Sequence, residues 1–274
     1  MSEQSSYQIS TIASNVEKEI NRLKAQVELF WDKECKHYIE FGLSDGMAIV
    51  EPGSGPGFIT EKILKRFPNV NITAVEIDPL LVDYARKYLS EKCLPNKYQV
   101  IQKSIMETDL PENSYDFAIT RLVLEHLPDP VKAVREIVRI LKPGGKAIFV
   151  DNDFEMHIMA YPNVTDLREL YNSYCQARYA EGGNPKIGRE LPLILKESGL
   201  SNVDFEVICA HSEVIGDEMF FKSEGLAIPS KLVHDGFLSS KVLGRISVEW
   251  RNMIKSEKHS IVRQLYMAVG EKLL

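Results

Sequence analysis

A short apolar run, residues 47–51 (MAIVE), stops at a glycine-rich turn, PGSGPGF, and a segment with helical spacing follows up to Pro68. Strand, glycine-rich turn and helix in this order are typical of an open α/β sheet, in which ligands bind outside the carboxyl ends of the strands. The pattern repeats, because residues 71–78 predict a second strand and a second helix begins at Pro79. This alternation constrains the fold more than any other feature of the sequence.

Five further strand-like segments follow, at residues 97–104, 115–123, 146–153, 203–214 and 261–274. Between two of them, residues 129–145 have helical spacing and finish in a glycine pair, which predicts the end of a helix. Strands joined by crossover helices form a parallel sheet. The sequence therefore predicts an α/β fold: a Rossmann-like, doubly wound sheet of about seven strands, mostly parallel, with a helical cap.

Charge and cysteine content exclude several classes of partner and site. The chain of 274 residues has a formal net charge of −6, which leaves no basic surface for the phosphate backbone of a nucleic acid. Cys35, Cys93, Cys175 and Cys209 form no CxxC pair, which argues against a structural zinc site or a disulfide framework. The N-terminus lacks the apolar stretch of a signal peptide, and no run approaches the length of a membrane span. We expect a cytoplasmic protein that binds neither nucleic acid nor membrane.

The turn from Glu51 to Gly57 lies where a strand meets a helix, and its glycines let a ligand approach the backbone closely. Its GxGxG pattern departs from the dinucleotide fingerprint, which weakens an NAD-binding interpretation, and it lacks the GK[ST] of a P-loop. Glu76 lies 19 residues after Gly57, at the end of a strand, where a carboxylate accepts both hydroxyls of a ribose. Taken separately, the glycines are equally well explained as turn residues, and Glu76 as a charge at a helix N-terminus.

Five motifs taken together resemble the class I S-adenosylmethionine-dependent methyltransferases in their order and spacing: EPGSGPG, VEID, LPENSYDFAI, VLEHLPDP and LKPGG. The resemblance covers residues 45–155 and extends more loosely to residues 182–200 and the closing YMAVGEKL. It implies transfer of a methyl group from S-adenosylmethionine, which becomes S-adenosylhomocysteine, to an O, N or C atom of a small molecule. Secondary metabolism and quinone formation are the contexts that this resemblance suggests.

Carried over position by position, the resemblance also implies a cofactor site. The residues so implied are Glu51, Gly53, Ser54, Gly55, Gly57, Glu76, Ile77, Ser104, Ile105, Met106 and Arg121. The glycines border the methionine part of the cofactor, Glu51 orients its ammonium group, and Glu76 binds the ribose. Ser104 stands where many relatives place an Asp on the adenine amine, and its hydroxyl is a weaker acceptor. Ile105 and Met106 flank the adenine ring.

Methyl transfer from a sulfonium is an in-line displacement, which needs a nearby nucleophile and, where that nucleophile carries a proton, a base. Polar side chains follow the fourth and fifth predicted strands, and His126 and Asp151 are the candidate catalytic residues among them. An ordinary histidine pKa of ~6.5 suits a base. However, relatives with diverse chemistries carry a histidine at the position of His126, so a packing or cofactor-contact role is the leading alternative.

The Asp151-Asn152-Asp153 triplet resembles the Asp-Asn pair that holds magnesium in catechol-type O-methyltransferases. Those enzymes also take an acidic ligand from the end of the fourth strand, where this chain has Arg121 and Leu122. A cage of oxygen ligands for a hard cation is therefore incomplete, and we expect no metal.

Aromatic residues late in the chain are candidates for a substrate pocket. Together with one residue near the N-terminus they are Tyr7, Tyr161, Tyr171, Tyr174, Phe220 and Trp250. The tyrosines are equally well explained as one side of a helix packed on the core. The Phe220–Phe221 pair is equally compatible with a dimer contact, so formation of a homodimer stays open.

We expect four segments along the chain: an N-terminal helical cap (1–43), a cofactor-binding α/β core (44–215), a helical insertion or lid (216–258) and a terminal strand (259–274). The cap contains a long amphipathic helix over residues 14–41, which precedes the first strand. We predict that this helix and the insertion form a mobile lid over the methyl donor, which would exclude water from the site. Packing on the outer layer of the sheet is the alternative.

Two other functions compete with transfer to a small molecule. An RNA- or protein-modifying methyltransferase needs a charged docking surface, and the acidic composition argues against one for nucleic acid. A catalytically silent protein that binds S-adenosylmethionine would keep the same cofactor motifs. Neither alternative has a positive feature in the sequence, and the small-molecule acceptor fits best.

Overall fold

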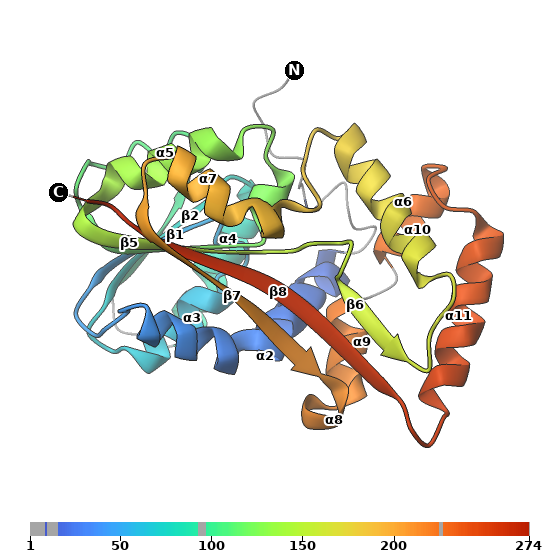
Figure 1. Cartoon of the computed structure of the whole chain (residues 1–274). Coiled ribbons are helices and arrows are strands. Elements are labelled where there is room, and N and C mark those ends of the chain that lie inside the picture. The colour runs from blue at the N-terminus through green and yellow to red at the C-terminus, as the bar shows by residue number, and fades with distance from the viewer. Residues whose placement is uncertain (1–8, 10–15, 93–96, 225–226, 274) are drawn as a thin grey trace.

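The computed structural model describes residue 9 and residues 16–92, 97–224 and 227–273, which form a mixed sheet flanked by helices (Figure 1). The strands are β1 (Ala48–Pro52), β2 (Asn71–Glu76), β3 (Tyr98–Gln102), β4 (Tyr115–Arg121), β5 (Leu141–Asp151), β6 (Ile158–Tyr161), β7 (Ser201–His211) and β8 (Ser260–Glu271). Their order in the sheet is β3-β2-β1-β4-β5-β8-β6, and β7 pairs with β8. β1 to β5 pair in parallel, whereas β8 is antiparallel to all three of its neighbours. The predicted Rossmann-like α/β fold is confirmed.

Helices connect and cover these strands. They are α2 (Val16–Glu40), α3 (Phe58–Arg66), α4 (Pro79–Glu91), α5 (Pro130–Ile140), α6 (Leu167–Ala180), α7 (Leu191–Glu197), α8 (Ser212–Ile215), α9 (Asp217–Glu224), α10 (Ala227–His234) and α11 (Ser240–Ile254). Two short 3-10 turns, η1 (Leu124–His126) and η2 (Ile187–Glu190), follow β4 and precede α7. None of the helices in the described part of the chain has both the length and the apolar character to cross a bilayer.

The sheet separates two apolar layers. Residues of β2 show the division. Ile72 belongs to the apolar cluster that includes residues of α2 and α3, and Ala74 to a cluster with α4, whereas Val75 belongs to the cluster that includes residues of α5 and α7. This alternation follows from the two-residue period of a strand, which sends successive side chains to opposite faces. As a result, both faces of the parallel strands are covered, as a parallel sheet requires.

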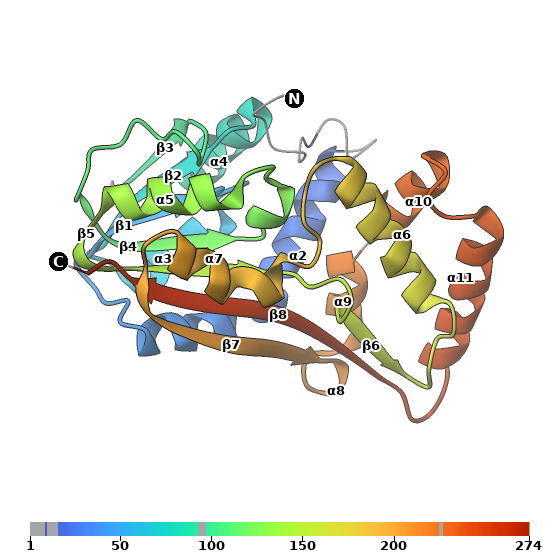
Figure 2. The same cartoon turned by 45° about the horizontal axis from the view of Figure 1, so that its top comes forward.

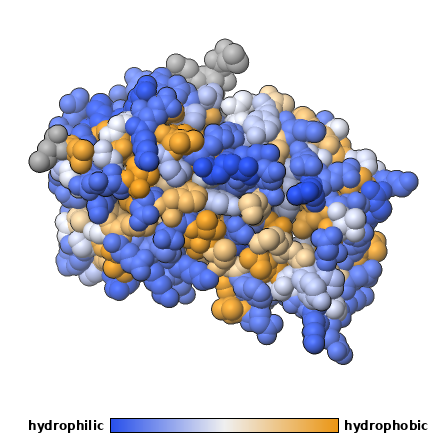
Figure 3. Space-filling model, in the orientation of Figure 1, coloured by the Kyte–Doolittle hydropathy of each residue, from blue (hydrophilic) through white to orange (hydrophobic). Residues whose placement is uncertain are grey.

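Four helices, α6, α9, α10 and α11, gather beyond the carboxyl ends of the parallel strands and form a helical cap there (Figures 1 and 2). The last three lie in the predicted insertion (216–258), whereas α6 lies in the segment predicted as core (44–215). β8 runs from this cap back into the core, pairing first with β6 and then with β5. β7 pairs with β8 along most of its length, and its residues Phe205 and Val207 are partly exposed. In the orientation of Figure 1, apolar surface gathers near the centre of the molecule (Figure 3). The segment boundaries at residues 44, 216 and 259 stay a prediction.

Two features differ from the sequence-based expectation. The helix expected over residues 129–145 ends at Ile140, and the Gly144–Gly145 pair belongs to β5. Pro143 has no amide hydrogen to continue a helix, and the backbone of the pair bonds instead to Lys272, with Gly144 N donating to Lys272 O at 2.7 Å. In addition, the four-residue strand β6 was not expected, because it is too short to show a pattern and depends on pairing with the distant β8.

A buried ion pair fixes α2 to the sheet. Glu34 on α2 is fully buried, and Arg121 Nε at the end of β4 lies 2.9 Å from its Oε1 and 3.0 Å from its Oε2. The same guanidinium donates from Nη2 to the carbonyl oxygen of Gln26 at 3.0 Å, and the Tyr38 hydroxyl donates to Glu34 at 2.8 Å. The N-terminal helix is therefore bound to the sheet at the edge where the site lies.

The first prediction concerns this ion pair. Glu34→Gln leaves the Arg121 charge buried and uncompensated, and we expect a loss of about 3–5 kcal/mol in the free energy of unfolding, measured by urea denaturation. Lys62→Ala is the matched control, because it breaks the partly exposed Lys62–Glu28 pair at 2.8 Å between α3 and α2. That control should lose less than about 1 kcal/mol. Equal losses in the two variants would contradict the role given to Glu34.

Candidate active site

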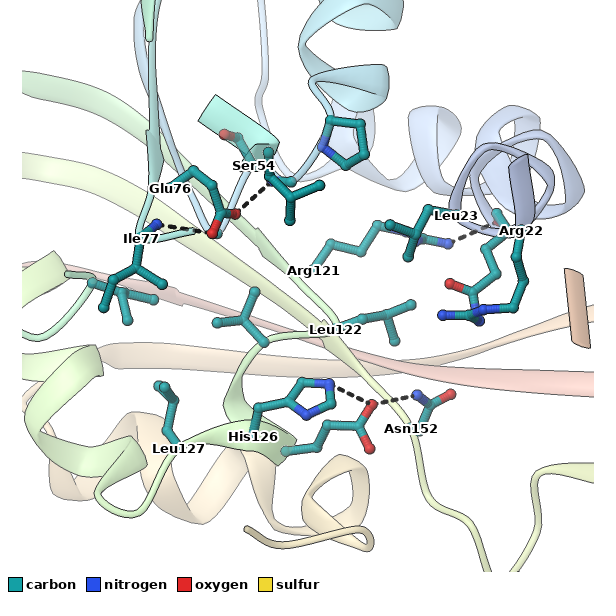
Figure 4. Close-up of a pocket in the computed structure, with 18 of the residues that line it drawn as sticks. Arg22, Leu23, Ser54, Glu76, Ile77, Arg121, Leu122, His126, Leu127 and Asn152 are labelled. Atoms are coloured by element: carbon teal, nitrogen blue, oxygen red, sulfur yellow. Dashed lines mark hydrogen bonds and ion pairs between the residues drawn. The ribbon is translucent and has the colours of Figure 1, made fainter. Parts of the chain in front are cut away.

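A cavity lies at the carboxyl ends of β1, β2 and β4, where the order of strands in the sheet reverses (Figure 4). The structure brings all of the predicted cofactor-binding residues except Gly57 to its wall: Glu51, Gly53, Ser54, Gly55, Glu76, Ile77, Ser104, Ile105, Met106 and Arg121. Gly57 begins α3 instead, where an added Cβ would lie 3.2 Å from Leu89 of α4. A glycine at this position therefore allows α3 to approach α4 closely.

The glycine turn and the end of β2 hold each other in place. Val75 O accepts hydrogen bonds from Gly53 N at 2.7 Å and Ser54 N at 3.0 Å. The Glu76 carboxylate accepts from Gly55 N at 2.8 Å through Oε2, and from Ile77 N and Asp78 N through Oε1 (Figure 4). Oε1 already accepts two hydrogen bonds, whereas Oε2 accepts one and keeps a further lone pair, so the carboxylate is oriented by backbone groups and still able to accept from a ligand.

Burial governs the protonation of both acidic residues beside the turn. It raises the pKa of Glu51 to about 8, although the hydrogen bond from the Thr60 hydroxyl and the charge of Arg121 oppose the shift. Burial also raises the pKa of Glu76, against the three backbone hydrogen bonds that stabilise its ionised form. Glu51 is therefore mostly a neutral acid at pH 7 and gains a charge only when a cation or a higher pH favours ionisation.

Two other predicted residues have clear local partners. Ser104 Oγ accepts from Met106 N at 3.2 Å, which fixes the loop after β3 at the cavity wall. Arg121 lines the cavity, but its guanidinium is engaged by Glu34 and by Gln26 O. Arg121 thus mainly holds α2 against the sheet. Leu23 and Gln26 of α2 line the same cavity.

The opposite wall carries a buried polar group after β4 and β5 (Figure 4). His126 Nε2 lies 3.6 Å from Glu125 Oε1, and Asn152 Nδ2 donates to the same oxygen at 2.9 Å. Burial and the positive charges of Arg178 and Arg22 hold the pKa of His126 well below its usual value, so its ring is neutral at pH 7. By contrast, burial raises the pKa of Glu125.

Asp151, the other candidate catalytic residue, is not at the cavity wall. Its carboxylate accepts from Asn152 N at 2.9 Å and Glu125 N at 3.3 Å, so it lies behind the group that lines the cavity. Burial, followed by the nearby Glu125, raises its pKa well above the usual value. Through these hydrogen bonds, Asp151 holds the backbone of the loops after β4 and β5 in place.

The Asp151-Asn152-Asp153 triplet does not converge on one point. Asp153 pairs with Arg189, whose Nη2 lies 2.8 Å from Oδ1, while Asn152 bonds to Glu125. Over the described ranges, no group of three or more His, Cys, Asp or Glu side chains is arranged to hold a metal ion. The carboxylates of Asp151 and Asp153 are instead used in contacts within the protein.

Comparisons with known proteins agree with this arrangement. Residues 50–149 match the family model of a methyltransferase domain. An uncharacterized methyltransferase of Schizosaccharomyces pombe is 34% identical over 163 residues, which are 57% of this chain and 58% of that protein. The ubiquinone biosynthesis O-methyltransferase of Stutzerimonas stutzeri is 27% identical over 150 residues, 50% of this chain and 63% of that protein. Residues 50–149 of this chain therefore form a methyltransferase domain of the class I S-adenosylmethionine-dependent type.

A solved structure shares the fold of this chain. It is that of Haemonchus contortus phosphoethanolamine N-methyltransferase 2, in complex with phosphomonomethylethanolamine and S-adenosylhomocysteine, with a TM-score of 0.58 and 16% identity. The match covers 89% of this chain and 53% of that one. The chain thus spans less than two thirds of the length of these three relatives. The family predicted from the sequence motifs is confirmed.

A second cavity adjoins the first inside the helical cap. Tyr171, Tyr174, Phe220 and Trp250, four of the predicted pocket residues, line it. Tyr161 lies elsewhere, at the end of β6 with 64% of its surface exposed, and Tyr7 falls outside the described residues. The two cavities share five wall residues: Phe154, Tyr174, Glu224, Ile228 and Leu232. We call the second cavity the aromatic chamber.

Phe220 is buried within this chamber, whereas its neighbour Phe221 is partly exposed and packs edge-to-face with Trp250 at 6.4 Å. The formation of a homodimer stays a prediction. Charged residues that no sequence motif indicated also line the first cavity: Arg22, Arg178, Glu224 and Arg263. Arg263 alone gave a signal, because a charged residue interrupts the apolar pattern of the last strand.

The second prediction concerns the glycine turn. Gly53 has φ +75°, and an added Cβ would lie 2.3 Å from Val123 Cγ2, so Gly53→Ala combines backbone strain with overpacking against a stiff side chain. We expect a loss of about 2–4 kcal/mol in the free energy of unfolding, measured by urea denaturation. Gly55 shares the positive φ but has open space around it, so Gly55→Ala should lose only about 1 kcal/mol.

A second change separates the two causes. Val123→Ala in the Gly53→Ala background removes the side chain against which the new methyl group packs. We expect this double variant to be more stable than Gly53→Ala alone. A Gly53→Ala protein no less stable than the Gly55→Ala protein would count against the close approach of the turn to β4.

Proposed function

We propose that this protein is an active methyltransferase that transfers the methyl group of S-adenosylmethionine to an O, N or C atom of a small molecule. The observation that supports this most directly is the joining of the two cavities: a turn and carboxylate suited to the cofactor share a wall with an apolar chamber. The family assignment supports the first half of the proposal. The chamber supports the second, because aromatic and apolar walls suit a small organic molecule better than a polymer.

The residues of the first cavity would bind the cofactor in the order that the family resemblance suggests. Glu76, oriented by three backbone amides, would accept hydrogen bonds from the ribose hydroxyls. Glu51 would pair with the ammonium group, and the Ser104 hydroxyl would accept from the adenine amine. Ile105 and Met106, both buried, would flank the adenine ring. When bound, the cofactor supplies a methyl group that its sulfonium already activates.

His126 is the candidate base on the opposite wall. Because its lowered pKa keeps the ring neutral at pH 7, it would be able to accept a proton from an acceptor hydroxyl or amine. Glu125 and Asn152 would orient the ring, since the Glu125 carboxylate lies beside Nε2 and is itself held by Asn152. The product of the cofactor would be S-adenosylhomocysteine. Secondary metabolism or quinone formation is the context we favour, in line with the quinone-pathway relative of Stutzerimonas stutzeri.

The third prediction tests this function. Calorimetry should show that S-adenosylhomocysteine binds, and Glu76→Ala should weaken its binding by about 1.5–3 kcal/mol, the scale of charge-assisted hydrogen bonds. Asp83→Ala, a change of the same charge at an exposed position on the following helix, should leave the affinity unchanged. Labelled S-adenosylmethionine incubated with a metabolite panel should yield a methylated product, with EDTA having no effect. Cofactor binding without any transfer would support the silent binding protein instead.

The fourth prediction concerns pH. Because Glu51 has a pKa of about 8 and must lose its proton to pair with an ammonium group, cofactor binding should release a proton at lower pH. The affinity for S-adenosylhomocysteine should therefore rise from pH 6 to pH 8, by up to about tenfold per pH unit, the limit for one proton released. The ionisation of Glu76 would add a change of the same sign.

Glu51→Gln is the variant that isolates this effect. It keeps the shape of the side chain but cannot ionise, so its affinity should be lower and should depend less on pH than that of the natural protein. Calorimetry in two buffers of different ionisation enthalpy measures the number of protons released. The same pH dependence in both proteins would exclude Glu51 as the ammonium partner.

A further inference from the structure

A charged cluster, of which Arg263 and His157 are buried and Glu224 is partly buried, lies where the first cavity meets the aromatic chamber. It consists of Arg263 on β8, Glu224 at the end of α9 and His157 between β5 and β6. Arg263 Nε lies 2.6 Å from Glu224 Oε1 and 3.3 Å from His157 Nε2, and His157 Nε2 lies 3.1 Å from Glu224 Oε2. All three residues line the first cavity, and Glu224 lines the chamber as well.

Three of the buried polar atoms that have no hydrogen-bond partner within the described residues belong to Arg263, His157 and Asn152, which all line the first cavity. They are Arg263 Nη1, His157 Nδ1 and Asn152 Oδ1. Arg263 is fully buried, and His157 and Asn152 are nearly so, yet all three residues line the same cavity. Because buried polar groups in native proteins are almost always paired, an unpaired donor (Arg263 Nη1), an unpaired acceptor (Asn152 Oδ1) and a ring nitrogen whose role depends on the tautomer (His157 Nδ1) indicate the place of a polar ligand group at the cavity wall.

The charges of the cluster cancel. Burial alone would raise the pKa of Glu224, but the Arg263 guanidinium and the His157 ring outweigh burial and lower it to about 2, so the carboxylate is ionised. Burial and the charge of Arg263 lower the pKa of His157, so this ring is neutral. The neighbouring Arg22 is balanced by Glu19 at 2.6 Å. An anionic ligand would therefore add an unbalanced charge to a buried site.

The chamber next to this cluster suits an apolar body. The Phe154 ring stacks on Tyr174 at 3.9 Å and on His157 at 4.3 Å, so aromatic faces continue from the chamber to the cluster. Trp250 lies on the far helix of the chamber, α11. A molecule that occupies both regions would place its apolar part among these rings and its polar part against Arg263, His157 and Asn152.

We propose that the methyl acceptor is an apolar molecule with an uncharged hydroxyl or carbonyl group, which Arg263, His157 and Asn152 bind beside the cofactor. A hydroxyl satisfies both kinds of unpaired atom, because its oxygen accepts from Arg263 Nη1 and its hydrogen is donated to Asn152 Oδ1. Glu224 determines the preference for a neutral group by balancing the charge of Arg263. The inference rests on the proposed function only in calling this ligand the methyl acceptor.

Tryptophan fluorescence measures binding directly in the chamber. The chain has two tryptophans, so Trp31→Phe leaves Trp250 as the one reporter. Three matched probes differ only in their polar group: 4-hexylphenol, 4-hexylbenzoate and hexylbenzene. In the Trp31→Phe protein at pH 7, we expect 4-hexylphenol to bind about tenfold more tightly than either other probe, the effect of one or two good hydrogen bonds. Equal binding of the three probes would overturn the proposal.

Removing the balancing charge gives the sharpest test. Glu224→Gln keeps the size of the side chain but leaves Arg263 with a net positive charge, so the preference should change to 4-hexylbenzoate. Glu218→Gln, the same change at a largely exposed position on α9, should leave the preference for 4-hexylphenol unchanged. If Glu224→Gln still prefers the phenol to the benzoate, charge balance is not what sets the specificity.

A double variant keeps the test valid if the unbalanced charge prevents folding. Glu224→Met with Arg263→Met removes both charges together and leaves neither one buried alone. This protein should bind 4-hexylphenol no more tightly than hexylbenzene, and a retained phenol preference would contradict the role of Arg263. S-adenosylhomocysteine binding, measured on the same samples, separates the two proposals. Cofactor binding without probe discrimination removes only the present inference, whereas probe discrimination without cofactor binding removes only the proposed function.

Discussion

The carboxyl ends of β1, β2 and β4 meet at one edge of the sheet, and the order of strands reverses between β1 and β4. At such a point the loops after neighbouring strands leave toward opposite faces, which opens a crevice that the sheet itself cannot fill. The glycine turn enters this crevice from one side and is tied to Val75 O of β2. The group around His126 enters it from the other side. Every contact proposed for the cofactor depends on this reversal.

The cofactor half of the site could be predicted because its signals are local. The glycine turn, Glu76 and the helix that begins at Pro79 lie within about one strand–helix unit, where turn chemistry and periodicity act over short distances. The structure places these residues at one cavity, as their spacing indicated. The Gly144–Gly145 pair shows where local signals fail. Its local pattern predicts the end of a helix, but hydrogen bonds to the distant Lys272 place it in a strand.

The acceptor half was largely beyond prediction because its residues come from distant parts of the chain. Arg121 lines the first cavity, as predicted, but the sequence did not indicate its partner Glu34, which lies 87 positions earlier on a different element. Arg263 and His157 are 106 positions apart and meet only because β8 passes the loop after β5. The aromatic residues gave a partial signal, since Tyr171 and Trp250 line the chamber while the equally conspicuous Tyr161 is exposed. Composition suggests a pocket, but only packing decides which rings form it.

α8 to α11 are inserted between β7 and β8, which are antiparallel neighbours in the sheet. The insertion therefore begins and ends at paired strands, near the point where His211 of β7 pairs with Val262 of β8. The sheet fixes only the distance between these two ends and not the length of what connects them. Much of the chamber wall is therefore an exchangeable module. Lengthening, shortening or replacing it would reshape the space for the acceptor while leaving the glycine turn and Glu76 untouched, which offers evolution and protein engineering a route to new acceptors on an unchanged cofactor site.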